Sequence, residues 1–167
     1  MDWFQDSYWY ESLSPADKER AQFLAEKFAE LDVVDPVSYS RGEIEFNQPT
    51  LAISMFVKSL WGGVKVWRDP KVVLAESMSP SSSDKLDRSA PLRRLLQAGA
   101  SAEDLAAVCG AVALESIARV LNLIELGPDD NEISVSWQLV EGGSEAQQPR
   151  LMDNLYEAFL GERPRGF

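Results

Sequence analysis

The sequence predicts a mostly helical α+β fold in a single globular domain spanning residues 1–167. Three patterns support this prediction. Capping residues stand before prolines at Ser14-Pro15 and Asp69-Pro70, an apolar stripe recurs at helical spacing through residues 102–126, and apolar and polar side chains alternate over residues 132–140. A chain of 167 residues is long enough to bury one core without disulfides or metals.

The first predicted helix begins after Ser14 and runs to about Leu31. Ser14 suits an N-cap, Pro15 suits the first turn, and Asp17 completes a capping box. Asp35-Pro36 is then interpreted as a break, and the alternation over residues 43–46 predicts a short, half-exposed strand.

The middle of the chain leaves one choice open. Asn47 and Pro49 favour a helix through Trp61 that ends at Gly62-Gly63, and the alternative is a buried strand over residues 51–57. A brief strand is expected over residues 64–67, followed by a helix from Pro70 to about Ser77. The Ser/Pro-rich segment at about 79–88 predicts a mobile loop within the domain.

The C-terminal half predicts a capped helical hairpin and a sheet. A short helix from Ser89 stops at Gly99, and Ser101 caps a long helix that reaches Leu126. We expect this long helix to be the central core helix, packed on a small, mainly antiparallel sheet that contains residues 132–140. Its predicted apolar stripe is Leu105, Val108, Val112, Ile117, Leu121 and Ile124. A last short helix is expected to end at Gly161.

The charge is strongly negative and unevenly distributed. The chain has 16 basic and 27 acidic side chains, a net charge of −11. Residues 1–46 carry −7, residues 47–100 carry +4, and residues 101–167 carry −8. Such a field repels nucleic acid and anionic lipid and attracts basic proteins, although it also serves solubility alone.

Cysteine use and apolar run length suggest a cytoplasmic protein. Cys109 has no partner for an internal disulfide, and acidic residues stand where a secretory signal needs positive charge. The most apolar runs are interrupted by Lys58 or by Glu115 and Arg119, so no membrane span is expected.

The residue types argue against familiar catalytic chemistry. The chain contains no histidine, which removes the commonest general base and metal ligand, and it has no phosphate-loop, dinucleotide or nucleophile-elbow motif. We therefore predict no catalytic residue, cofactor or metal. Cys109 is expected to be a small buried hydrophobe, and Glu115 is expected to form a surface ion pair with Arg119.

These observations favour a non-catalytic acidic protein-binding domain, of the inhibitor or immunity type, that neutralises a basic toxin or nuclease. The alternatives are a small-molecule-binding or regulatory domain and a carboxylate- or metal-dependent enzyme. The aromatic-rich N-terminus either docks on its own core or anchors the partner. The predicted partner contacts are Asp129, Asp130, Glu132, Trp3 and Trp9.

Overall fold

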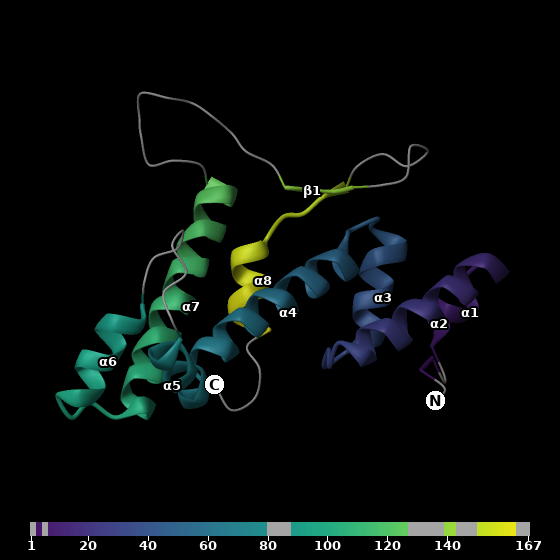
Figure 1. Ribbon diagram of the computed structural model, residues 1–167. Coiled ribbons are helices and arrows are strands. Elements are labelled where there is room, and N and C mark those ends of the chain that lie inside the picture. The colour runs from purple at the N-terminus through teal and green to yellow at the C-terminus, as the bar shows by residue number, and fades with distance from the viewer. Residues whose placement is uncertain (1–2, 5–6, 80–87, 127–138, 143–149, 163–167) are drawn as a thin grey trace, which may run out of the picture. The chain divides into compact units, whose positions relative to one another are not determined.

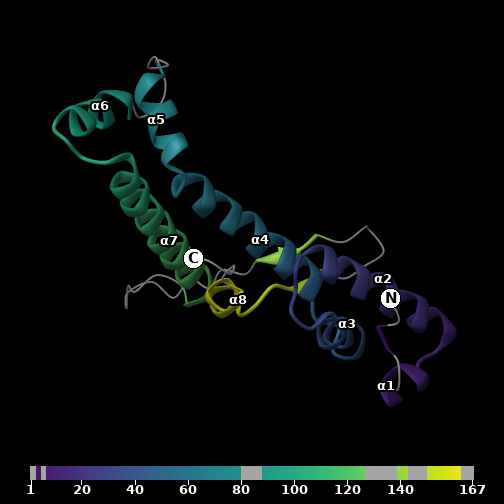
Figure 2. The ribbon, with the colours of Figure 1, turned by 90° about the horizontal axis from the view of Figure 1, so that it is seen from below.

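The computed structural model describes residues 3–4, 7–79, 88–126, 139–142 and 150–162. The described residues form eight helices and one two-stranded antiparallel sheet (Figures 1 and 2). The mostly helical α+β class is therefore confirmed. In chain order the elements are α1 (Tyr8–Glu11), α2 (Pro15–Glu30), α3 (Pro36–Glu45), α4 (Thr50–Trp67), α5 (Pro70–Met78), α6 (Ser89–Gln97), α7 (Ala102–Leu126), β1 (Val140–Glu141), β2 (Arg150–Leu151) and α8 (Leu155–Gly161).

The chain divides into two compact units, and helices α4 and α7 each contribute to both. Unit 1 consists of Met1–Ser59 and Leu121–Phe167, and unit 2 consists of Leu60–Val120. Unit 1 contains 20 acidic and 8 basic residues, a net charge of −12, whereas unit 2 contains 7 acidic and 8 basic residues, a net charge of +1. The whole negative excess therefore belongs to unit 1. A single domain remains a prediction.

Helix α2 forms as the sequence predicts. The Ser14 hydroxyl oxygen accepts a hydrogen bond from the Asp17 N–H at 3.2 Å, which satisfies one of the free donors of the first turn. Near the C-terminal end of α2, the ring of Phe28 makes a T-shaped contact with the ring of Tyr39 from α3, and the two ring centroids lie 5.4 Å apart. Helices α2 and α3 lie side by side in both ribbon views. The buried side of α2 consists of Ala21, Leu24, Ala25 and Phe28.

The N-terminal aromatics dock largely on the chain's own core. Phe4 is 4% exposed and stacks on Tyr10 with ring centroids 4.5 Å apart. Trp3 and Trp9 pack, half-buried, against the cluster that Phe4 forms with α2. Tyr8 is the exception, because 90% of its surface is exposed.

The strand predicted over residues 43–46 is wrong, because these residues belong to helix α3 and its end. Asp35-Pro36 starts this helix, with the Asp35 carboxylate accepting a hydrogen bond from the Ser38 N–H at 3.1 Å. The expected sides are also reversed: Glu43 is 3% exposed and Phe46 is 63% exposed. Asp35-Pro36 is therefore a helix start, like Ser14-Pro15 and Asp69-Pro70, and not a break.

Residues 50–61 are helical, so the choice of helix over strand is confirmed, but the predicted end at Gly62-Gly63 is wrong. Helix α4 continues to Trp67, and no strand forms over residues 64–67. Val57, Trp61 and Val64 are all buried and recur at helical spacing across the two glycines. Burial of this common face favours continuation of the helix more strongly than two glycines disfavour it.

Unit 2 contains the predicted helices α5 and α6. The Asp69 carboxylate caps α5 by accepting from the Lys71 N–H at 2.9 Å, and Gly99 ends the α6 region with a φ of 98°. Where α7 approaches the end of α4, a Cβ added to Gly110 would lie 2.0 Å from Cγ of Arg68. Any larger residue at this position would force the Arg68 side chain to move.

Helix α7 has the predicted bounds, and the predicted apolar stripe is wrong at two of its six positions. Val108 and Val112, placed in the apolar stripe by the sequence, are 61% and 58% exposed. The buried positions are Ala106, Gly110 and Leu121, and Leu121 belongs to the predicted stripe. Its other members Leu105, Ile117 and Ile124 are half-buried. Only 11% of the most apolar 18-residue window of α7 is buried. The prediction of a central core helix is thus corrected to a helix buried along one narrow side.

Helix α7 is also long and apolar enough to cross a membrane by length and composition. The sequence predicts no membrane span because Glu115 and Arg119 interrupt this apolar run, but two charged residues do not disqualify a helix of this length and hydropathy. Core helices of soluble proteins pass the same test, so the criterion alone assigns no membrane to this chain.

The described residues contain a small antiparallel sheet, as predicted. Val140 pairs with Leu151 and Glu141 with Arg150 in antiparallel register. Most of the strand predicted over residues 132–140 lies outside the described residues, as does nearly all of the Ser/Pro-rich segment at 79–88. Helix α8 ends at Gly161 as predicted and buries Leu155 and Phe159.

Candidate functional site

The outward face of helix α2 combines acidic side chains with one exposed aromatic ring. Glu19, Phe23, Glu26 and Glu30 follow one another at intervals of four, three and four residues, so they share one side of the helix. This side lies opposite the buried residues of α2. The ring of Phe23 is 52% exposed, so an aromatic group stands in water among carboxylates. We call Glu19, Phe23, Glu26 and Glu30 the α2 acidic face.

One base partly balances the α2 acidic face. The Lys27 amino group lies 2.8 Å from a Glu30 carboxylate oxygen and 5.8 Å from the centroid of the Phe23 ring. Glu19 and Glu26 are exposed and form no ion pair with another described residue. These two carboxylates therefore remain available to a basic partner.

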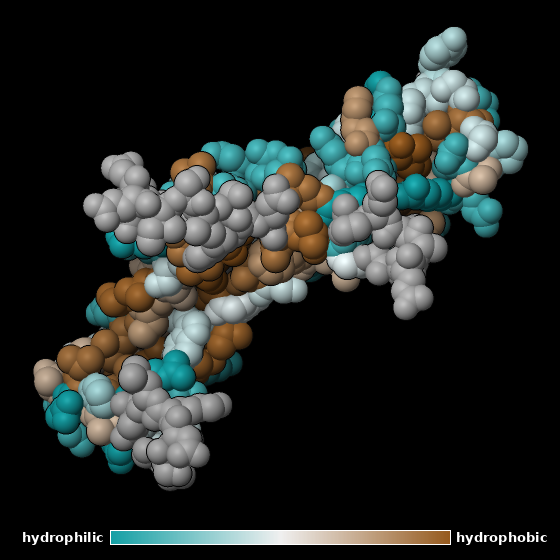
Figure 3. All heavy atoms as spheres, turned by 90° about the horizontal axis from the view of Figure 1, so that it is seen from above, coloured by the Kyte–Doolittle hydropathy of each residue, from teal (hydrophilic) through white to brown (hydrophobic). Residues whose placement is uncertain are grey.

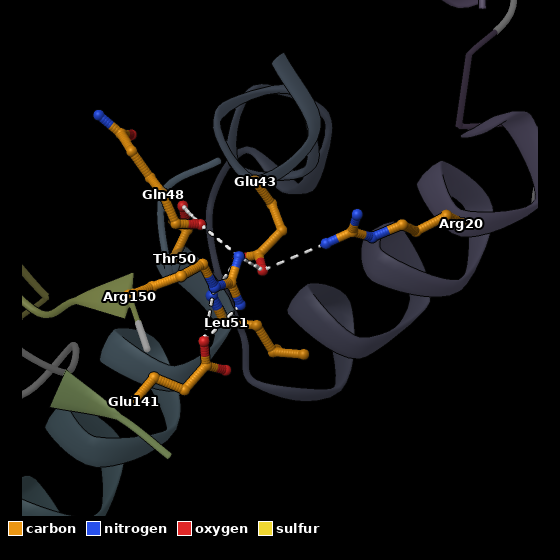
Figure 4. Close-up of polar contacts among 7 residues, drawn as sticks. All are labelled: Arg20, Glu43, Gln48, Thr50, Leu51, Glu141 and Arg150. Carbon is orange, nitrogen blue, oxygen red and sulfur yellow. Dashed lines mark hydrogen bonds and ion pairs between the residues drawn. The ribbon is translucent and has the colours of Figure 1, made fainter. Parts of the chain in front are cut away.

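A second polar cluster is centred on the buried carboxylate of Glu43 (Figure 4). One carboxylate oxygen lies 2.5 Å from Nη1 of Arg150 and 3.8 Å from a guanidinium nitrogen of Arg20. The other oxygen accepts a hydrogen bond from the Leu51 N–H at 2.9 Å, at the start of α4. Glu43 of α3 therefore joins α2, α4 and β2.

Arg150 is fully engaged in this cluster. Its Nε and Nη2 lie 2.6 Å from the Glu141 carboxylate, opposite it on β1, and Nη1 also donates to the Gln48 carbonyl at 3.2 Å. Burial lowers the pKa of Arg150, but hydrogen bonds to Glu43 and Glu141 outweigh burial, and the net shift is upward. Because its main donors are already used, the cluster fastens the sheet to the helices rather than binding a ligand.

A third cluster holds the Glu162 carboxyl, which follows α8, against α3 and α4. One of its oxygens accepts hydrogen bonds from the Ser54 hydroxyl at 3.2 Å and the Tyr39 hydroxyl at 3.4 Å. Burial raises the pKa of Glu162, although both hydrogen bonds lower it. Burial and the neighbouring Glu162 charge also raise the pKa of Tyr39. The arrangement favours a proton on this carboxyl more than water does.

The structure brings few of the sequence-predicted contact residues to a common surface. Asp129, Asp130 and Glu132 lie outside the described residues, so the acidic turn remains a prediction. Trp3 and Trp9 are half-buried against their own core. The predicted surface pair of Glu115 and Arg119 is confirmed, with 2.7 Å between the charged groups. Cys109 is half-buried rather than fully buried.

Phe23 is not among the contact residues predicted from the sequence. The available signal was an aromatic residue on the polar side of a clearly amphipathic helix, flanked at helical spacing by Glu19 and Glu26. Within the described ranges, no three acidic or cysteine side chains are grouped closely enough to hold a metal ion.

Comparison with known proteins gives no family. No family model matches the chain, and no curated protein or solved structure matches it at significant similarity.

Proposed function

We propose that this chain is a non-catalytic protein-binding domain that uses the α2 acidic face to bind a basic protein, in the manner of an inhibitor or immunity protein. The observation that carries the proposal is the exposed ring of Phe23 between Glu19 and Glu26. An aromatic anchor surrounded by charge is an arrangement that contributes strongly to protein interfaces.

The charge distribution supports the same proposal. Unit 1, which contains α2, carries a net charge of −12, whereas unit 2 is nearly neutral at +1. A field concentrated in one unit steers a basic partner toward that unit and speeds the encounter at low salt. The partner class that fits is a protein whose functional surface is basic, such as a nuclease or toxin that binds polyanions.

The experiment is affinity capture from the native cell with the tagged protein at low and at high salt, followed by mass spectrometry and by titration of any captured partner. We expect one stoichiometric basic protein whose affinity falls with salt. Phe23→Ala is expected to weaken binding at least tenfold, which is the effect of losing an interface anchor. The double reversal Glu19→Lys with Glu26→Lys is expected to reduce the association rate.

The matched control is Glu103→Lys with Asp104→Lys, which changes the net charge equally at exposed positions of unit 2. This variant is expected to retain most of the binding. Equal losses in both double variants would indicate a response to net charge alone, and unchanged binding by Phe23→Ala would contradict the proposed surface.

A further inference from the structure

Helix α7 carries a second apolar face opposite its buried side. Large apolar side chains reach the molecular surface in broad areas (Figure 3), and five of them belong to α7. These five are Val108, Val112, Val120, Leu123 and Leu126, with exposed fractions from 39% to 79%. All but Val120 lie on the side of the helix opposite the buried residues. A helix that is apolar on both sides normally has a partner on both sides. We call the residues Val108, Val112, Glu115, Arg119, Leu123 and Leu126 the α7 outer face.

Two charges lie in the middle of the α7 outer face. Glu115 and Arg119 are 65% and 79% exposed, and they follow Val112 at intervals of three and four residues. They therefore continue the line of the exposed apolar residues along the helix. An occupant of this face must match one acid and one base in the centre of an otherwise apolar surface.

We propose that the occupant is a second copy of this chain, packed antiparallel on the α7 outer face. Consider a two-fold axis at the level of Ile117, midway between Glu115 and Arg119. It places Glu115 opposite Arg119 of the second copy, and it places Val108 opposite Leu126 of the second copy. In this arrangement each charge faces an opposite charge of the second copy, and each apolar end of the face packs against the apolar end of the second copy.

The same residues disfavour the other arrangements. A parallel pair brings Glu115 near Glu115 of the second copy, and like charges in an interface are repulsive. In a membrane-spanning helix, Glu115 and Arg119 would lie near the middle of the apolar window, where each charge is costly. The antiparallel pair instead gives each charge a second opposite charge, at a surface distinct from the α2 acidic face.

The test measures self-association by sedimentation equilibrium over a wide range of concentration. We expect a reversible dimer of the wild-type chain. Glu115→Arg and Arg119→Glu, made singly, are each expected to weaken dimerisation roughly tenfold or more, and the double exchange is expected to restore it. Because both positions are exposed, these variants should keep the wild-type helix content, which circular dichroism verifies.

Orientation is measured by disulfide cross-linking in a Cys109→Ala background. Mixing Val108→Cys chains with Leu126→Cys chains is expected to give the mixed dimer in preference to either self-linked dimer. Preference for self-linked dimers overturns the antiparallel arrangement. A chain that remains monomeric at all concentrations, or that stays monomeric while co-sedimenting with phosphatidylcholine–phosphatidylglycerol vesicles, overturns the proposal.

Discussion

Nη1 of Arg150 lies 2.5 Å from a carboxylate oxygen of Glu43, although more than 100 residues separate the two in the sequence. The contact fastens the short strand β2 to helix α3 within unit 1. Glu43 is 3% exposed, and its other oxygen accepts from the backbone of α4. Isolated two-stranded pairs are marginal in water, so this ion pair is a principal tertiary support of the small sheet.

Replacing Glu43 by Gln should destabilise unit 1 strongly. The substitution removes the charge that balances Arg150, with the loss of roughly 2–4 kcal/mol that accompanies breaking a buried pair. Urea denaturation measures the change. Glu45→Gln is the control, since it breaks the exposed pair of Glu45 with Arg41, which water screens, and should destabilise the protein far less. Similar losses in both variants would remove Glu43 from this role.

Glu162 should make stability depend on pH. Burial raises its pKa above the ordinary value of 4.5. Its contribution to stability is therefore complete below pH 4.5 and is lost as the pH rises through the raised pKa of the folded state. Glu162→Gln keeps a hydrogen-bonding side chain without the charge. Its stability relative to wild type should increase from pH 4 to neutral pH, measured by thermal unfolding.

Tyr39→Phe provides a second variant for the same pH dependence. It removes a hydrogen bond that lowers the pKa of Glu162, so the pH at which stability is lost should move upward. A difference between wild type and Glu162→Gln that stays constant with pH would contradict a raised pKa at this carboxyl.

Two helical glycines should respond oppositely to alanine. At Gly110 the added methyl group would meet the Arg68 stem, so Gly110→Ala is expected to destabilise the protein by about 1–3 kcal/mol. At Gly62 nothing lies within 4 Å of the added Cβ, so Gly62→Ala is expected to stabilise α4 by up to about 1 kcal/mol. Chemical denaturation of the two variants side by side checks the prediction. Stabilisation by Gly110→Ala would mean that α4 and α7 do not approach closely there.

Asp35 should be the N-cap that defines α3. Its pKa is lowered, mainly by the hydrogen bond from the Ser38 N–H and next by that from the Ser38 hydroxyl. Asp35→Ala is expected to cost about 1 kcal/mol, whereas Asp35→Asn should retain most of the cap. The extra stability of the wild type over Asp35→Ala is fully present above pH 3.8 and is lost as the pH falls through the lowered pKa of Asp35. Equal stability of Asp35→Ala and wild type at neutral pH would exclude the cap.

Helices whose end signals are local can be predicted from the sequence. Ser14 and Asp69 cap α2 and α5 through hydrogen bonds to residues two or three positions away, and Gly99 stops the chain with a positive φ. Such interactions depend on neighbours in the sequence, so they can be predicted without tertiary information. The absence of histidine and the net charge of −11 are likewise properties of the sequence alone.

Which face of each helix is buried depends on tertiary packing. Gly62 does not end α4, because Trp61 and Val64 share one buried face, and Val108 is exposed because α7 approaches its neighbour through Gly110. The burial of Glu43 required Arg150 to come from the far end of the sequence. Sequence pattern and helix propensity describe an isolated helix, whereas the burial of its side chains depends on the elements that pack against it. Tertiary packing therefore sets which side chains, including Phe23, remain exposed to a partner.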